Sequence, residues 1–204
     1  MEEKQFLNIE GSSGESVFFR PLVWCLGKNI QTTEKNIQTF LDKEWKHIVD
    51  LHDDRLLVLV GALLVENAIN EFLGAIIPKY KPLHKRREFT FSIRIELARA
   101  LRLCPSRIFN SADIIRDIRN DFVHDLSCNA FSKLSPDRLK SMRDHYSKFD
   151  PHFNVEQKND EETFRKLVSI TSLALLVYRK HVIKLNEFIH SEELFIALKQ
   201  FCKA

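Results

Sequence analysis

Residues 53–77 read DDRLLVLVGALLVENAINEFLGAII, and this stretch decides the fold. From Leu56 to Leu63 it is apolar nearly all round, which is typical of a helix at the centre of a bundle. Pro78 follows directly and marks the end of the helix, because proline cannot continue one. The most apolar part, Leu56–Val65, is about half as long as a bilayer crossing requires and leads into Glu66, so we expect no membrane segment.

Helical signals continue on both sides of this stretch. Capping residues and apolar positions at helical spacing predict further helices at residues 33–51, 90–103, 108–126, 135–148, 159–189 and from 191 onward. The segment at 108–126 could be broken near residues 110–111, and residues 78–88 are expected to form a basic loop. Residues 1–32 have weak periodicity and are expected to be an N-terminal arm or extension. The sequence therefore predicts one all-α domain at 33–204, a bundle of about six or seven helices.

The composition agrees with a helical protein. The chain has 204 residues, 44% of them hydrophobic, but only five glycines and six prolines, fewer turn residues than a β-sandwich or barrel needs. Its net charge of +3 permits contact with nucleic acid without requiring it. The four cysteines are far apart, which favours reduced cytoplasmic thiols over a zinc site or disulfides. We expect no metal and no cofactor.

One segment, Ala112–Leu126, combines an apolar stripe with a polar ridge. The ridge follows steps of three and four residues, so its side chains share one face of a helix; it consists of Asp113, Arg116, Asn120 and His124. Arg119 lies beside the ridge, roughly 140° around the helix from His124, and both side chains could reach one ligand. The plain alternative is that Arg119 and Asn120 cap a neighbouring element and that His124 is a structural residue.

The heptapeptide at 118–124, Ile-Arg-Asn-Asp-Phe-Val-His, resembles the signature of the mannitol operon repressor family, with Val123 where that pattern has alanine. The apolar helix at 54–73 and the segment Phe89–Ala98 are also similar to parts of that family, and the resemblance covers about residues 51–126. The family is similar to the wider HEPN superfamily of α-bundles. Many of its members are dimeric, metal-independent ribonucleases, while others bind nucleotides or proteins without catalysis.

The residue types suit RNA cleavage without a metal. A histidine can act as base or acid near neutral pH, which makes His124 the candidate for proton transfer. Arg119 presents a planar fork of donors to phosphate oxygens, and Asn120 could orient His124 or bind phosphate. One motif supplies a single histidine, whereas the reaction needs an acid and a base. A homodimer that joins two motifs supplies both.

Other residues are expected to support this site. Glu66 or Asn70 could face Arg119 and hold its guanidinium, or could mark the solvent side of the long helix, and Arg116 and Asp121 flank the motif on its own helix. The densest positive run could follow a phosphate backbone or could be a solvated loop; it contains Lys79, Lys81, Lys85, Arg86 and Arg87.

These features leave two functional hypotheses of different classes. The first is a cytoplasmic RNA-cleaving or RNA-binding protein, a toxin or defence effector with a dimeric Arg119/Asn120/His124 site and an antitoxin or regulatory protein as a further partner. The second is a non-catalytic transcriptional regulator that resembles the mannitol operon repressor. Because the sequence shows no recognisable helix-turn-helix, such a regulator would act through protein contacts.

Overall fold

The computed structural model describes residues 48, 50–149 and 159–189. This part of the chain is all-helical, with six α-helices, one 3₁₀ turn and no strand, which confirms the predicted fold class. The elements are α4 (Asp54–Ile76), α5 (Tyr80–His84), α6 (Phe91–Ala100), α7 (Ser106–His124), the 3₁₀ turn η2 (Phe131–Lys133), α8 (Pro136–Tyr146) and α9 (Asp160–Ile189). The predictions for residues 1–32, for most of 33–51 and for the segment after 190 lie outside the described residues.

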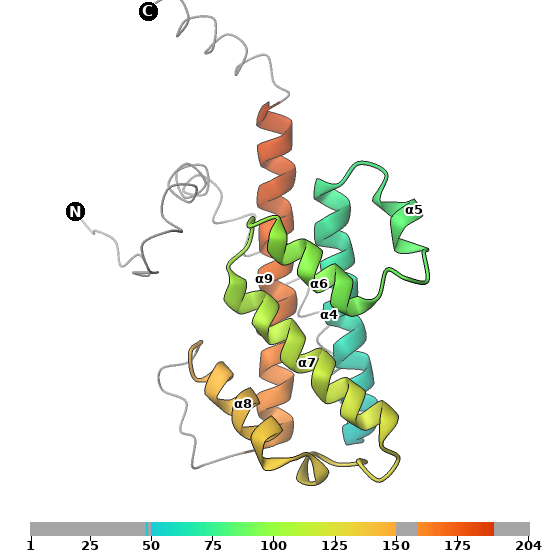
Figure 1. Cartoon of the computed structure of the whole chain (residues 1–204). Coiled ribbons are helices and arrows are strands. Elements are labelled where there is room, and N and C mark those ends of the chain that lie inside the picture. Colours follow the sequence, from blue (N-terminus) through green and yellow to red (C-terminus); the bar gives the residue numbers. More distant parts are fainter. Residues whose placement is uncertain (1–47, 49, 150–158, 190–204) are drawn as a thin grey trace, which may run out of the picture.

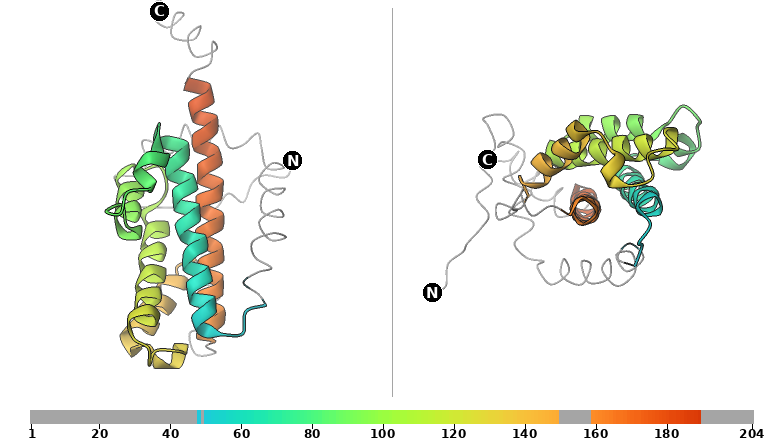
Figure 2. Two further views of the ribbon diagram at one scale, coloured as in Figure 1. Left: turned by 90° about the vertical axis from the view of Figure 1, so that its right-hand side faces the viewer. Right: turned by 90° about the horizontal axis from the view of Figure 1, so that it is seen from below.

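Helix α4 is a core element of the bundle, but it is not buried all round as its sequence predicts: Leu56 is 47% exposed and Leu63 57% exposed. Asp53 caps its start by accepting a hydrogen bond from the Leu56 amide at 2.7 Å, and the helix ends at Ile76, two residues before Pro78. It packs against α6, α7 and α9. Figures 1 and 2 show α9 running beside α4 in the same direction, whereas α7 runs the opposite way. The end of α7 therefore lies next to the start of α4.

Length and composition alone would allow α4 to cross a membrane, and it is the one described helix of that kind. Its buried face consists of residues such as Leu57, Val65 and Phe72, which pack inside the bundle. The core helix of a helical bundle meets the same two criteria.

Helix α9 packs tightly on α4 at Gly61. A Cβ atom built there would lie 3.0 Å from atoms of both Phe164 and Val168, so a side chain at this position requires those two side chains to move. At Gly74, near the other end of α4, the nearest atom is 3.7 Å away on Tyr80, an ordinary contact distance. The packing of α9 therefore favours glycine at position 61, whereas position 74 has room for a methyl group.

Two sequence predictions of local structure are corrected. Residues 80–84 form helix α5 rather than a loop, because the Tyr80 ring is buried and its hydroxyl donates to the Asn70 side chain at 2.9 Å. Helix α7 runs unbroken through residues 110–111. The polar Ser111 fits within the helix because its hydroxyl donates to the Arg107 carbonyl one turn earlier, at 3.1 Å. The same hydroxyl also contacts Nε2 of His145 at 2.9 Å.

The chain after α7 returns to the core through one aromatic residue. The Phe131 ring lies between Phe122 of α7 and Phe164 of α9, with centroid distances of 5.6 and 5.5 Å. This contact closes the end of the bundle at which α7 stops and α4 begins. The predicted motif lies at the same end.

Candidate functional site

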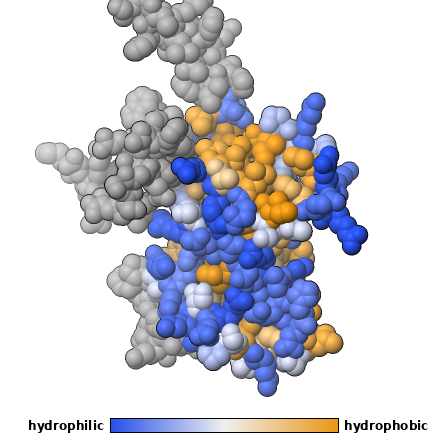
Figure 3. Space-filling model, in the orientation of Figure 1, coloured by the Kyte–Doolittle hydropathy of each residue, from blue (hydrophilic) through white to orange (hydrophobic). Residues whose placement is uncertain are grey.

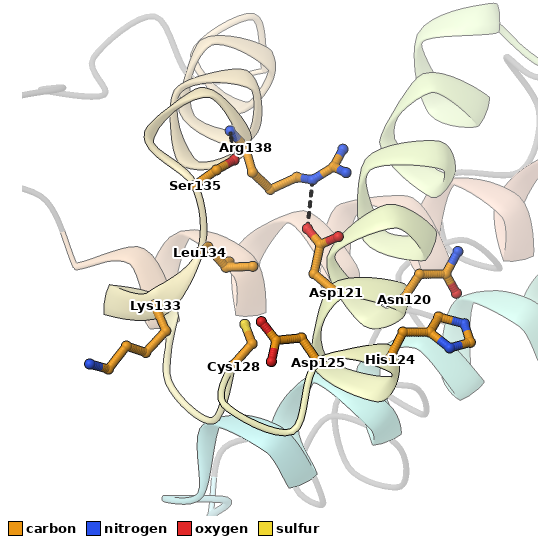
Figure 4. Close-up of a pocket in the computed structure, with 9 residues that line it drawn as sticks. All are labelled: Asn120, Asp121, His124, Asp125, Cys128, Lys133, Leu134, Ser135 and Arg138. Carbon is orange, nitrogen blue, oxygen red and sulfur yellow. Dashed lines mark hydrogen bonds and ion pairs between the residues drawn. The ribbon is translucent and has the colours of Figure 1, made fainter.

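The three motif residues lie on the last turns of α7. The Arg119 guanidinium donates to the side-chain oxygen of Asn120 at 3.1 Å, and both residues are partly buried. His124 is the last residue of the helix and is exposed. Figure 4 shows Asn120 and His124 on the same side of α7, pointing away from Arg138. Helix α7 thus places Asn120 and His124 one turn apart on one side, as the spacing predicts, and Arg119 bonds to Asn120 from the adjacent position.

The expected partners of Arg119 on α4 have other partners. Glu66 forms an ion pair with Arg94 of α6, whose Nε also donates to the Phe89 carbonyl at 2.9 Å. Asn70 accepts the hydroxyl of Tyr80. The prediction that Glu66 or Asn70 would hold Arg119 is corrected, because α6 brings its own arginine to Glu66.

The other two supporting residues belong to a network of ion pairs on the outer side of α7. Arg116 bonds to Asp113 at 2.8 Å and to Asp117 at 2.7 Å, and its guanidinium also donates to Ser92 of α6. Arg138 of α8 continues the network by bonding to Asp117 at 3.0 Å and to Asp121 at 2.9 Å. Arg116 and Asp121 therefore tie α7 to α6 and to α8.

An open hollow of about 540 Å³ lies beside the motif, between the end of α7 and the start of α8. It is lined by Asn120, Asp121, His124, Asp125, Cys128, Lys133, Leu134, Ser135 and Arg138. In Figure 4 the carboxylates of Asp121 and Asp125 are on the side of α7 that faces the hollow. Hydrogen bonds from the side chain and backbone amide of Ser127 lower the pKa of Asp125.

The segment after His124 is held by Asp54 and Arg55, the first two residues of α4, which no sequence pattern singled out. One nitrogen of the Arg55 guanidinium donates to the carbonyls of Asp125, Leu126 and Cys128 at 3.2, 3.1 and 3.0 Å. Asp54 accepts the Phe131 amide at 2.9 Å. The partners are 70 to 77 positions apart in the chain, so no local pattern could identify them.

Large apolar side chains are exposed around the same end. Leu126 is 81% exposed, Leu56 47% and Val123 39%, and two of these three flank His124 in the sequence. Figure 3 shows a largely hydrophilic face over α7, with a small apolar area at the lower right, where α7 ends; the larger apolar area in this view lies in its upper half, away from the motif. Exposed apolar residues that gather beside polar ones are typical of a surface that contacts another molecule.

The positive run lies at the other end of the bundle. All five of the selected cations are exposed, on and around α5 (Lys79, Lys81, Lys85, Arg86 and Arg87). They follow the last residue of α4, whereas the motif lies near its first residue, and 23 helical residues correspond to about 34 Å. Within one copy, the positive run and the motif therefore form two separate surfaces.

The described residues contain no group of three or more His, Cys, Asp or Glu that could hold a metal ion. Two cysteines fall in this part of the chain, Cys104 and Cys128; both are free and buried, and burial raises the pKa of each thiol. No protein-family model matches the chain, and no match was found among curated proteins or among solved structures.

Proposed function

We propose that this chain is a HEPN-like RNA-cleaving or RNA-binding protein that needs no metal and whose site contains Arg119, Asn120 and His124. The observation that carries the proposal is the bond from Arg119 to Asn120 beside an exposed histidine at the same helix end. A guanidinium, an amide and an imidazole within one or two turns of a helix can bind a phosphate and move a proton.

Each residue has a separate task in RNA cleavage. His124 would accept the proton of the 2′-hydroxyl, which then attacks the neighbouring phosphorus atom. Arg119 would stabilise the charge that develops on the phosphate oxygens. Because its oxygen accepts from Arg119, the Asn120 side chain can direct its NH₂ group to the RNA. A second histidine must protonate the leaving 5′-oxygen.

A second copy of the chain would supply that histidine. The exposed Val123 directly precedes His124 and the exposed Leu126 follows it by two residues, so a contact that buries them brings two motifs close to each other. We expect a homodimer, and replacing Leu126 with Glu should shift it toward monomer in sedimentation. A wild-type protein that is monomeric at micromolar concentration would contradict the composite site.

One observation favours the alternative, a non-catalytic regulator similar to the mannitol operon repressor. Asp117, Asp121 and Asp125 place three carboxylates beside the motif, and Arg138 is already bonded to two of them. Negative charge at this position repels a polyanion. The same surface, with its exposed leucines, would suit a protein partner, such as an antitoxin or another regulator.

The decisive experiment measures RNA cleavage in the presence and absence of EDTA. We expect wild-type protein to cleave in EDTA and His124→Ala to lose on the order of 10²–10⁴-fold in rate. His52 is exposed and lies outside the motif, so His52→Ala is the matched control and should retain activity. If the folded wild-type protein neither cleaves nor binds any RNA tested, the regulator is the better reading. Loss of cleavage in EDTA that Mg²⁺ restores would contradict the metal-free mechanism.

A further inference from the structure

The backbone that leaves α7 is closed in an unusual way. Helices often end with a residue in the left-handed conformation, which lets the next amides bond back to the last carbonyls. Here the residue after His124, Asp125, is extended, with φ −109° and ψ 107°. Beyond the helix, Arg55 of α4 donates to the carbonyls of Asp125, Leu126 and Cys128, and the Asp125 carbonyl also accepts from the Cys128 amide at 3.1 Å.

This arrangement matters because His124 has little else to fix it. The residue is exposed, so core packing does not hold its ring. Its position depends on the backbone, which the helix holds on one side through the bond from the Asp125 amide to the Asp121 carbonyl at 3.1 Å. On the other side, a local turn is closed by the Ser127 and Cys128 amides, which donate to the Asp125 carboxylate and carbonyl. The contacts that tie this turn to another helix through its carbonyls come from a single guanidinium, that of Arg55.

We propose that Arg55 is a positioning residue for His124: its guanidinium fixes the chain just beyond the helix and thereby fixes where the imidazole can reach. The proposal rests on the function proposed above. Arg55 itself touches neither the motif side chains nor a substrate in this arrangement. It acts through the backbone of residues 125–128.

A second contact, at Phe131, also holds this segment to the bundle, so the effect of Arg55 on His124 can be tested without unfolding the protein. Asp54 holds the Phe131 amide, and the Phe131 ring packs between two core rings. Without Arg55 the chain would still return to the core at Phe131. Only residues 125–130 would gain freedom, while the bundle remains closed.

The test compares Arg55→Gln and Arg55→Lys with a control, Arg179→Gln. Arg179 also pairs with α4, through Glu71 at 3.0 Å, but at the far end of the helix. The first readout is NMR of the His124 imidazole together with amide hydrogen exchange at residues 124–128. We expect Arg55→Gln to broaden or shift the imidazole signals and to speed exchange, and Arg179→Gln to change neither.

The second readout is the kinetics of RNA cleavage. A displacement of about 1 Å can reduce a rate by on the order of 10²-fold, so kcat of Arg55→Gln should fall by about that factor. KM should stay within about twofold, because the contacts of Arg119 with phosphate are unchanged. Arg55→Lys should recover part of kcat, since its ammonium keeps the charge and a single donating nitrogen but sits on a shorter side chain. If Arg55 only stabilised the fold, its substitution would lower the melting temperature without a fall in kcat at nearly constant KM.

The outcomes separate this inference from the proposed function. Unchanged imidazole signals and exchange rates in Arg55→Gln overturn the inference, whether or not the protein cleaves RNA. Wild-type kcat in a variant whose residues 124–128 have loosened also overturns it, while the proposed function stands. If wild-type protein cleaves no RNA but the imidazole moves in Arg55→Gln, the positioning is supported and the ribonuclease function fails.

Discussion

Arg94 and Arg119 provide the sharpest test of which arginine serves the fold and which serves the site. Arg94 is buried and pairs with Glu66, whose side chain is 26% exposed. Arg119 donates to a neutral amide, that of its neighbour Asn120. Substitution with alanine therefore leaves an unpaired carboxylate in one case and an unpaired neutral amide in the other, and the two losses of stability should differ.

The magnitudes follow from these partners. Arg94→Ala leaves a carboxylate without its cation, which costs about 3–5 kcal/mol for a fully buried pair. Because water reaches part of Glu66, we expect about 2–4 kcal/mol, which lowers the melting temperature of a chain of this size by about 5–15 °C. Arg119→Ala leaves a partly exposed amide oxygen and should cost about 1 kcal/mol or less. His124 is exposed, so His124→Ala should change stability by less than about 0.5 kcal/mol.

The assay measures melting temperature and RNA cleavage on the same three variants. We expect Arg119→Ala and His124→Ala to stay folded and to lose cleavage, and Arg94→Ala to melt early. The double variant Arg94→Met/Glu66→Leu should recover most of the stability, because neither charge remains unpaired. The reasoning is refuted if Arg119→Ala destabilises the protein as much as Arg94→Ala does. That result would make Arg119 a structural residue and would favour the regulator.

Three further predictions concern packing, pH and the positive run. Gly61→Ala should destabilise the protein by about 1–2 kcal/mol because Phe164 and Val168 must shift to admit its methyl group, whereas Gly74→Ala should stabilise it by about 0.5–1 kcal/mol, both measured by urea unfolding. Burial lowers the pKa of His145 in the folded state, so protonation favours unfolding; stability should fall as the pH drops below about 6.5, and His145→Gln should flatten that dependence. Lys85→Ala with Arg86→Ala should weaken RNA affinity and reduce its salt slope by about 1.5, with cleavage at saturating RNA unchanged.

The helices could be predicted because their signals are local. Asp53 and Pro78 bound the central helix, Thr90 caps α6, and the serine and proline at 135–136 open α8, all as expected. Each signal depends on a few neighbouring residues whose chemistry is visible in the sequence. The placement of Asn120 and His124 on one side of a helix follows from helical spacing in the same way.

The pairing of side chains was decided by tertiary structure alone. Glu66 could have met any of several arginines, and it is the position of α6 that brings Arg94 to it rather than Arg119. The same holds for Arg138, which reaches the motif helix from α8, and for Arg55, which holds the chain beyond it. An ion pair or a carbonyl contact between distant segments depends on which helices are neighbours and how they are rotated. The sequence determines which residues need a partner, but the packing of the helices determines which partner lies within reach.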